Sequence, residues 1–352
     1  MKNLPLNYNF LKPKIIKKLI QAHKALAELN WLSQKIPNQN ILINSLSLQE
    51  AKDSSEIENI ITTHDELYKS QVDNSFISTE AKEVANYKDA LLYWFEKVKK
   101  DKLLLNRDIL RIQEILEKND AGFRTQSGTK LKNDKTWETI YTPPQNIADI
   151  KKLMSNLEQY INNDELEDID TLIKMAIIHH QFESIHPFYD WNWRTWRIIN
   201  ILYLVKNDLL NMPILYLSNY IIKNKSNYYK LLQEVRENEN WDEWILYMLD
   251  AIEKTSIDTM EMIKAIWELM WKTKNSMKEK VPKIYSKDLL EVIFSHPYTK
   301  IDFLVERMSI HRETASKYLN TLVKEWYMFP LQIKNSKYFV NIELFELLKK
   351  WL

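Results

Sequence analysis

HPFYDWNWRTWR, residues 186–197, lies between two apolar segments of helical character, Met175 to Phe182 and Ile198 to Val205. It places one His, one Asp, one Asn and two Arg within twelve residues. A loop that leads into a helix exposes backbone N–H groups at the positive end of the helix dipole, so it favours anions. The guanidinium groups of Arg194 and Arg197 can add bidentate contacts to phosphate. The stretch therefore predicts an anion-binding loop.

Helical periodicity continues on both sides of this loop. Apolar residues at helical spacing predict a helix around residues 15–29 that ends before Pro37. Further helices are predicted at about 45–70, 78–100, 107–118, 147–162, 168–182, 194–206, 215–238 and 241–277. Gly122 to Pro144 differs, because it carries both glycines, the run Thr139-Ile140-Tyr141-Thr142 and a Pro-Pro stop. These residues predict a short β-hairpin or an extended flap.

The C-terminal part reads as a separate small module after Pro282. Residues 286–296, 300–307 and 311–324 predict three short helices, and Met328 to Asn341 predicts two strands around a polar turn. Three helices followed by a hairpin is the winged-helix order, and a short turn separates the second and third helices. The module has 11 basic and 8 acidic side chains, so its charge indicates DNA binding only weakly. Winged helices also bind proteins or dimerise.

Composition limits the classes of function. The chain has 352 residues and a net charge of +1, so no global field indicates nucleic acid or an anionic membrane. It has no cysteine, which excludes disulfides, thiolate metal sites and a Cys nucleophile. No stretch reaches 18 uninterrupted apolar residues, and the N-terminus has no apolar signal region. We therefore expect a soluble cytoplasmic protein without membrane contact.

Glycine is scarce in this chain and tryptophan is frequent. Average glycine usage would give roughly 25 residues in a chain of this length, whereas only Gly122 and Gly128 are present, beside 12 tryptophans. Glycine is the residue that enters positive φ without steric cost. Either the fold avoids turns with positive φ, or some residues that are written as other amino acids stand at glycine positions.

Written with Gly in place of its three Trp residues, the stretch 186–197 becomes HPFYDGNGRTGR. It then resembles the signature of the Fic family, HPFx(D/E)GNGRxxR, whose usual activity is transfer of AMP from ATP to a protein hydroxyl. The departures are Trp191 and Trp193, where the family has Gly so that backbone amides can approach the phosphates. The matching residues are His186, Pro187, Phe188, Asp190, Asn192, Arg194 and Arg197.

The resemblance implies a mainly α fold, in which a Fic-type helical bundle carries a short β-hairpin flap and is followed by a C-terminal winged-helix domain. Residues 1–100 would form the Fic N-terminal helical region with an inhibitory motif. Residues 101–280 would form the catalytic core, and residues 283–352 the winged helix-turn-helix domain.

The resemblance also implies a role for each matching residue. His186 would be the general base that takes the proton from the target hydroxyl as it attacks the α-phosphorus. Asp190 would hold Mg²⁺, which prefers carboxylate and phosphate oxygens. Arg194 and Arg197 would bind the β- and γ-phosphates, and Thr195 would help to cap the following helix.

Further contacts to ATP are implied on either side of these residues. Asn192 and the following amides would form the anion hole, together with the backbone at Trp191 and Trp193. Tyr228 and Tyr229 match a family pair near the adenine, although two adjacent helical tyrosines are equally typical of a core. The segment Thr139 to Thr142 matches the flap that holds the target backbone as an added strand.

An inhibitory motif is implied N-terminal to the core. Ser54-Ser-Glu-Ile-Glu58-Asn59 fits the family's (S/T)xxxE(G/N) helix motif. Glu58 would pair with Arg197 and occupy the guanidinium that the terminal phosphate needs. The alternative interpretation is a solvated helix start with a capping Ser and a first-turn Glu.

One hypothesis joins the tryptophans to the missing glycines. The three Trp of residues 186–197 stand where the Fic signature or a helix start calls for Gly. Four more, Trp31, Trp94, Trp137 and Trp326, fall where chains of this type usually carry Gly. A genome that reads UGA as glycine, translated with a table that reads it as tryptophan, would explain all seven. The codons at residues 191, 193 and 196 decide it.

The main interpretation is therefore a protein adenylyltransferase that uses ATP and Mg²⁺ to modify Tyr, Ser or Thr hydroxyls of a target protein. Two alternatives stay open. Some Fic relatives transfer another phosphate-containing group. The chain can also be a transcriptional regulator with a vestigial Fic core that binds DNA through residues 300–341, where Arg312, Lys317 and Lys324 decorate the recognition helix. The sequence also leaves open whether the chain forms a homodimer.

Overall fold

The computed structural model describes residues 1–36, 39, 41–44, 46, 49–50, 52, 79–132, 137–333 and 336–351. By its internal contacts the chain divides into two compact units. The first comprises Met1–Asn30 and Asn86–Ser256, and the second comprises Trp31–Ala85 and Ile257–Leu352. The mainly helical fold expected from the sequence is confirmed, with small antiparallel sheets beside the helices. The expected domains 1–100, 101–280 and 283–352 divide the chain differently and stay predictions.

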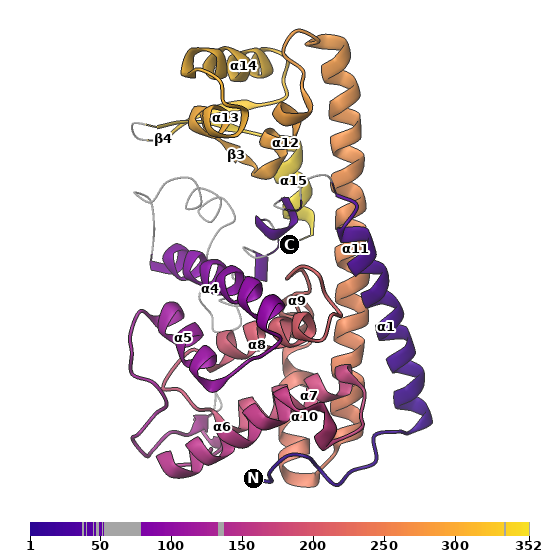
Figure 1. Ribbon diagram of the computed structural model, residues 1–352, viewed down its shortest axis with the longest axis vertical. Helices are drawn as coiled ribbons and strands as arrows, with labels where there is room; N and C mark the ends of the chain where they lie inside the picture. The colour runs from indigo at the N-terminus through magenta and orange to yellow at the C-terminus, as the bar shows by residue number, and fades with distance from the viewer. Residues whose placement is uncertain are drawn as a thin grey trace. The chain divides into compact units, whose positions relative to one another are not determined.

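The first unit is a bundle of helices (Figure 1). Its last helix, α11, begins in this unit and continues beyond Ser256 into the second. The helices with residues in this unit are α1 (Pro13–Ser33), α4 (Thr79–Asp101), α5 (Asn106–Glu117), α6 (Ile147–Asn162), α7 (Thr171–Ile185), α8 (Asn192–Lys206), α9 (Ser218–Lys223), α10 (Lys225–Asn238) and α11 (Trp241–Lys280), and a 3₁₀ turn at Asp164–Leu166 follows α6.

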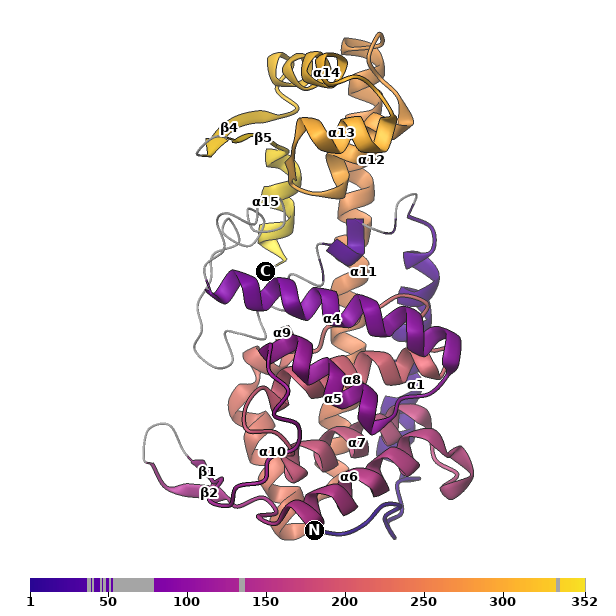
Figure 2. The same ribbon diagram turned by 60° about the vertical axis from the view of Figure 1, so that its left-hand side comes forward.

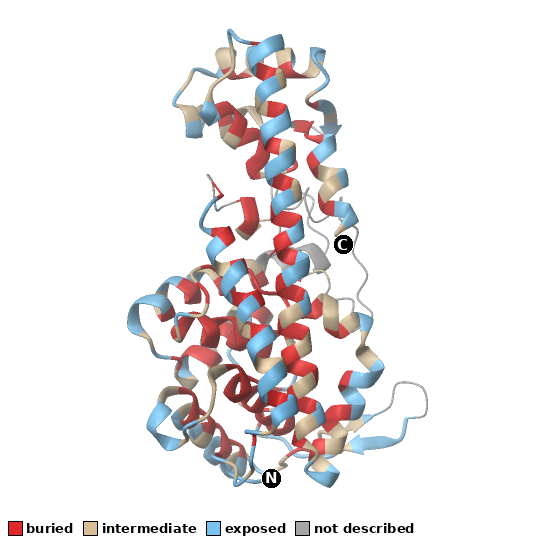
Figure 3. Ribbon diagram, turned by 90° about the vertical axis from the view of Figure 1, so that its right-hand side faces the viewer, coloured by how far each residue is buried: buried red, intermediate tan, exposed pale blue. Residues whose placement is uncertain are grey.

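Helices α7 and α8 form the core of this unit. Every residue of α7 from Leu172 to Ile185 is buried, as is every residue of α8 from Arg194 to Lys206 (Figure 3). A helix that is buried all round is a core helix rather than a surface helix. The two helices pack on each other, α6 packs on α7, and α5 packs on α8. Both ends of the loop between α7 and α8 are therefore fixed in the most densely packed part of the unit.

A hairpin precedes α6 in the first unit (Figure 2). Strand β1 (Leu131–Lys132) pairs antiparallel with β2 (Thr139–Tyr141), and Leu131 lies opposite Tyr141. The hairpin predicted between Gly122 and Pro144 is thus confirmed. Asn146 then caps α6, because its side chain accepts a hydrogen bond from the backbone N–H of Ala148 at 2.9 Å.

The second unit contains the C-terminal elements. A three-stranded antiparallel sheet has the order β3 (Tyr298–Thr299), β5 (Ser336–Val340), β4 (Phe329–Ile333). Helices α13 (Ile301–Met308) and α14 (Arg312–Lys324) meet at a turn where Ser309 has a φ of 53°. The predicted order of three helices and a hairpin is present, whereas β3 and α15 are additional, and the winged-helix assignment stays a prediction. The elements are α12 (Lys287–Ser295), β3 (Tyr298–Thr299), α13 (Ile301–Met308), α14 (Arg312–Lys324), β4 (Phe329–Ile333), β5 (Ser336–Val340) and α15 (Ile342–Lys350).

The prediction of a single helix at 215–238 is wrong, because α9 ends at Lys223 and α10 begins at Lys225. Asn224 stands between them with φ −123° and ψ 25°. Its side-chain amide donates to the carbonyl of Tyr220 at 2.8 Å, and such a local bond competes with the helical hydrogen-bond pattern. Periodicity alone does not register a one-residue break of this kind.

No helix in the described part of the chain is both long and apolar enough to cross a membrane.

Candidate active site

His186 stands at the C-terminal end of α7. Its backbone has φ 48° and ψ 60°, the left-handed conformation, and its N–H donates to the carbonyl of Phe182 at 2.9 Å. Burial, together with the nearby guanidinium groups of Arg124 and Arg236, lowers the pKa of the imidazole to about 4. At neutral pH the ring is therefore uncharged, which is the form that accepts a proton.

Asn192 fixes the shape of the loop between α7 and α8. Its Oδ1 accepts a hydrogen bond from the N–H of Phe188 at 2.9 Å, and its Nδ2 donates to the carbonyl of Phe188 at 2.9 Å. Phe188 is fully buried and contacts the ring of Phe123, with 5.5 Å between the ring centroids. The Asn192 side chain is thus engaged within the loop. In an anion hole, Asn192 would therefore contribute its backbone N–H.

Helix α8 begins directly after Trp191, which is its N-cap and has a φ of 62°. The Trp191 side chain makes no capping hydrogen bond, so the first N–H groups of α8 lack the usual side-chain acceptor. Thr195 supports the start of the helix, since its Oγ1 donates to the carbonyl of Trp191 at 3.0 Å. The carboxylate of Asp190 is exposed and accepts from the N–H of Trp191 at 2.7 Å.

The two arginines of the loop are both buried on the first turns of α8. The guanidinium carbon of Arg194 lies 3.4 Å from the centre of the Trp191 ring and 4.6 Å from that of Trp193. The guanidinium carbon of Arg197 lies 4.9 Å from the centre of the Trp193 ring. Both arginines therefore lie on the first turns of α8, and indole rings stack on their guanidinium groups.

Three tryptophans have a backbone that favours glycine. Trp137, Trp191 and Trp326 have φ values of 58°, 62° and 64°. All three belong to the seven tryptophans that are expected to stand at glycine positions. The side chains of Trp137 and Trp326 are 74% and 89% exposed, so little packing compensates for the conformation. An L-residue in this region costs about 1–2 kcal/mol relative to glycine.

The two predicted adenine-contacting tyrosines lie in different environments. Tyr228 is buried, and its hydroxyl is 2.8 Å from Nε2 of His179 in the core. Burial raises the pKa of Tyr228 well above its usual value and lowers that of His179 well below. Tyr229 is 48% exposed. Only Tyr229 presents a large part of its ring to solvent.

The flap segment Thr139 to Thr142 approaches the last turn of α7. The hydroxyl of Tyr141 donates to the carbonyl of Ser184 at 3.0 Å, two residues before His186. On the same strand, the carbonyl of Ile140 accepts from Nε2 of Gln233 at 3.1 Å. Thr139, Ile140 and Thr142 are exposed, whereas Tyr141 is half-buried. Tyr141 of the hairpin and Ser184 are 43 residues apart in the sequence, yet they are in contact two residues before the candidate base.

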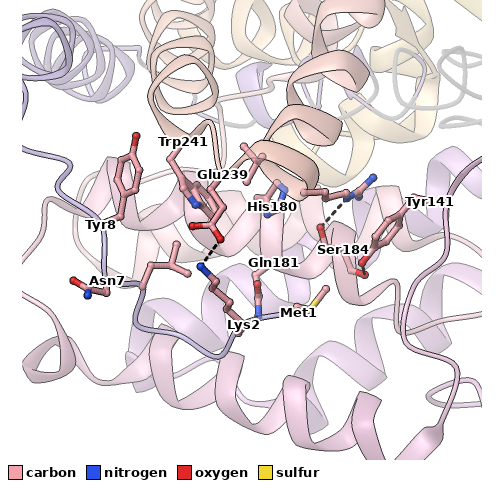
Figure 4. A pocket seen from close by; sticks show the side chains of 13 residues that line it. Met1, Lys2, Asn7, Tyr8, Tyr141, His180, Gln181, Ser184, Glu239 and Trp241 are labelled. Atoms are coloured by element: carbon pink, nitrogen blue, oxygen red, sulfur yellow. Dashed lines mark hydrogen bonds and ion pairs between the residues drawn. The ribbon is translucent and has the colours of Figure 1, made fainter.

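A cavity of about 350 Å³ opens next to this contact (Figure 4). Tyr141, Ser184 and Arg236 line it together with residues of the N-terminal segment. Nε of Arg236 donates to Oγ of Ser184 at 3.0 Å, and the guanidinium lies 4.0 Å from the Tyr141 ring centre. No residue of 186–197 lines the cavity, so it is separate from the predicted anion site.

Sequence reasoning missed two charged groups close to His186. Arg124 is fully buried and donates to backbone carbonyls of the loop, including that of His186 at 2.8 Å. Glu183 is buried on α7, and burial raises the pKa of its carboxyl to about 7. One signal in the sequence could have pointed to Arg124, namely its position two residues after Gly122, which is one of only two glycines.

The predicted inhibitory residues Ser54, Glu58 and Asn59 lie outside the described residues.

The bundle and its loop define a Fic-type fold, as comparison with solved structures shows. A Fic family protein from Desulfovibrio desulfuricans G20 is similar over 96% of this chain and 98% of its own, with a TM-score of 0.61 and 18% identity. Fic-1 from C. elegans, residues 134–508, has a TM-score of 0.54 and 17% identity over 71% of this chain and 73% of its own. A Fic domain containing signaling protein from Bacteroides thetaiotaomicron VPI-5482 has a TM-score of 0.54 and 15% identity, over 71% of this chain and 97% of its own.

Sequence comparison identifies the parts on either side of the loop. Residues 16–96 match the Fic/DOC family N-terminal model, and residues 269–344 match the C-terminal domain of SoFic-like protein adenylyltransferases. A probable protein adenylyltransferase from Aquifex aeolicus (strain VF5) is 30% identical over 138 residues, which are 39% of this chain and 39% of that protein. The chain therefore carries a Fic N-terminal domain and a SoFic-like C-terminal domain, and the resemblance to the Fic family is confirmed.

Proposed function

We propose that this chain transfers AMP from ATP to a hydroxyl of a Tyr, Ser or Thr side chain on a target protein. The observation that carries the proposal is the meeting of three features at one loop. An uncharged His186 ends α7, α8 begins uncapped a few residues later with Arg194 and Arg197 on its first turns, and the flap strand β2 contacts the last turn of α7. They match the needs of a base, a phosphate site and a site for the target backbone.

The reaction would proceed by attack of the target hydroxyl on the α-phosphorus. His186 accepts the hydroxyl proton as the new oxygen–phosphorus bond forms, and the bond to the diphosphate breaks. The backbone N–H groups at the start of α8 and the guanidinium groups of Arg194 and Arg197 stabilise the negative charge that develops on the diphosphate. The products are AMP-protein and diphosphate.

Asp190 fits one ligand position for Mg²⁺ bound with ATP. Its carboxylate is exposed beside the helix N-terminus, and Oδ1 accepts a hydrogen bond from one backbone N–H. The described residues hold no group of three or more His, Cys, Asp and Glu side chains that could bind a metal by themselves. Magnesium usually needs only one or two carboxylates because substrate phosphates and water complete its shell. The ion would supply charge neutralisation at the phosphates.

Autoinhibition by Glu58 is part of the proposal on the strength of the motif SSEIEN alone. A carboxylate at Arg197 would compete with the terminal phosphate for the same guanidinium.

Incubation with α-labelled ATP tests the activity. The full chain should label itself or a partner protein weakly, and His186→Ala should abolish the label. ATP labelled on the γ-phosphate should give no protein label. Label from the γ-phosphate instead would show phosphate transfer and contradict the proposal. His23→Ala is a matched control, because this histidine lies on α1, outside residues 186–197. Its Nε2 forms a hydrogen bond with the Asp170 carboxylate at 2.8 Å.

No observation favours the DNA-binding alternative. Of the three basic residues expected on the recognition helix, Arg312 forms an ion pair with Asp302 inside the second unit. That contact neutralises part of an already weak basic surface. We therefore keep one function, the nucleotidyl transfer.

A further inference from the structure

Arg124 is a buried cation whose partners are backbone carbonyls. Its Nε donates to the carbonyl of His186 at 2.8 Å, and its Nη2 donates to those of Ile185 at 3.4 Å and Pro144. Its own N–H donates to the carbonyl of Pro187 at 2.9 Å. Within the described part of the chain no carboxylate is among the groups that act electrostatically on its guanidinium, and its Nη1 is buried without a hydrogen-bond partner. Burying a guanidinium without a counter-ion is costly, so the carbonyls must replace its lost water.

The carbonyls that Arg124 binds are of two origins. Those of Ile185 and His186 belong to the C-terminal end of α7, where helical carbonyls lack intrahelical partners and the helix dipole is negative. The third carbonyl belongs to Pro144, which lies three residues after strand β2 of the flap. One planar guanidinium therefore joins the end of the flap to the backbone of the candidate base.

The backbone of Arg124 is itself held against the loop. Oη of Tyr189 accepts from the N–H groups of Thr125 at 2.9 Å and Gln126 at 3.3 Å. On the other side of Arg124, the ring of Phe123 packs on that of Phe188. Residues 123–126 thus run along residues 186–189 with contacts at several successive positions. Arg124 has little freedom to move independently of His186.

We propose that Arg124 is the positioning residue of the catalytic base: it holds His186 in the left-handed conformation and couples it to the flap. The inference rests on the proposed role of His186. The left-handed conformation of His186 is sterically unfavourable for an L-residue, and a bidentate clamp on the carbonyls at the helix end opposes its relaxation. Arg124 contacts no part of the α8 N-terminus in these hydrogen bonds, so its loss should affect the chemical step and spare ATP binding.

Kinetics of Arg124→Gln test this role. We expect kcat for AMP transfer to fall about 10- to 100-fold, the cost of a misplaced reacting group, with KM for ATP within about twofold. Arg124→Lys should recover part of the rate, because an ammonium can reach one carbonyl but lacks the planar fork. Arg111→Gln is the matched control, since Arg111 is exposed and pairs with Glu114 on α5. Unchanged kcat in a folded Arg124→Gln protein would overturn the proposal.

A second readout does not depend on activity. NMR titration of ¹⁵N-labelled histidines should show the pKa of His186 higher in Arg124→Gln than in the parent, because a nearby cation is removed. Arg111→Gln should leave it unchanged. If the parent transfers no AMP but the titration shifts, the proposed function fails while the contact stands. If Arg124→Gln does not fold, the kinetics of Arg124→Lys decide, because this variant keeps the charge but not the planar fork, and a parent-like kcat refutes the role.

Discussion

The guanidinium carbon of Arg194 lies 3.4 Å from the centre of the Trp191 ring. Such stacking is favourable in itself, since the ring face attracts a cation. The N–H groups that bind phosphate lie in the guanidinium plane, and the rings of Trp191 and Trp193, the latter at 4.6 Å, occupy space beside that plane. The chain with tryptophan at both positions therefore has its phosphate site partly filled by its own side chains.

Replacing these indoles should open the site. We expect Trp191→Gly with Trp193→Gly to tighten ATP binding about tenfold or more, the value of a charge-assisted hydrogen bond to phosphate. Isothermal titration calorimetry with ATP measures this. Trp271→Gly, at an exposed position on α11, is the control and should not change ATP affinity. Equal affinity in the double variant and the parent would mean that the indoles do not obstruct the arginines.

Mass spectrometry of the protein from its native source tests the glycine hypothesis. The peptide that contains residues 186–197 should carry Gly at 191, 193 and 196. The backbone supports this at residue 191, because glycine adopts positive φ without steric cost. Intact tryptophan in that peptide, or UGG at these codons, would refute it.

Stability measurements test the same hypothesis at two exposed positions. Trp137→Gly and Trp326→Gly should raise the free energy of unfolding by up to about 1 kcal/mol, because both residues have positive φ and bury little surface. Trp271 is 65% exposed but lies inside α11, so Trp271→Gly should lower the free energy of unfolding by about 1 kcal/mol. Thermal and urea unfolding give all three values. Destabilisation of equal size at all three would show that the left-handed positions tolerate tryptophan.

The pH dependence of transfer should report the buried base. The pKa of His186 is lowered to about 4, so its uncharged form persists as pH falls from 8 to about 5 and is lost below. The acid limb of kcat/KM attributable to His186 should therefore lie well below pH 6.5. A limb near pH 7 that disappears in Glu183→Gln would come from that carboxyl, whose pKa is about 7. A limb at pH 6.5 that survives this change would contradict a buried imidazole.

Removal of the Glu58 carboxylate should increase activity. Glu58→Gly is expected to raise AMP transfer because the Arg197 guanidinium would then be available to the terminal phosphate. Labelling with α-labelled ATP measures the gain, and Glu56→Gly, two residues earlier in the same motif, is the matched control. Equal labelling of Glu58→Gly and the parent would refute the inhibitory assignment.

Local features of this protein were predictable from its sequence. The helical content, the hairpin around Thr139 to Tyr141 and the loop 186–197 at a helix start all follow from periodicity and turn chemistry over a few residues. The break at Asn224 was not predictable, since a side chain that bonds Tyr220 competes locally with a helix that its apolar pattern favours.

The sequence alone determined which chemical groups stand together at residues 186–197, because they are neighbours along the chain. The tertiary structure decided their state. Burial sets the pKa of His186, and the clamp of Arg124 comes from a segment 62 residues away. Whether the indoles of Trp191 and Trp193 meet the arginines depends on the backbone conformation at the start of α8. Desolvation and long-range hydrogen bonds arise from packing between distant segments, which no local pattern encodes.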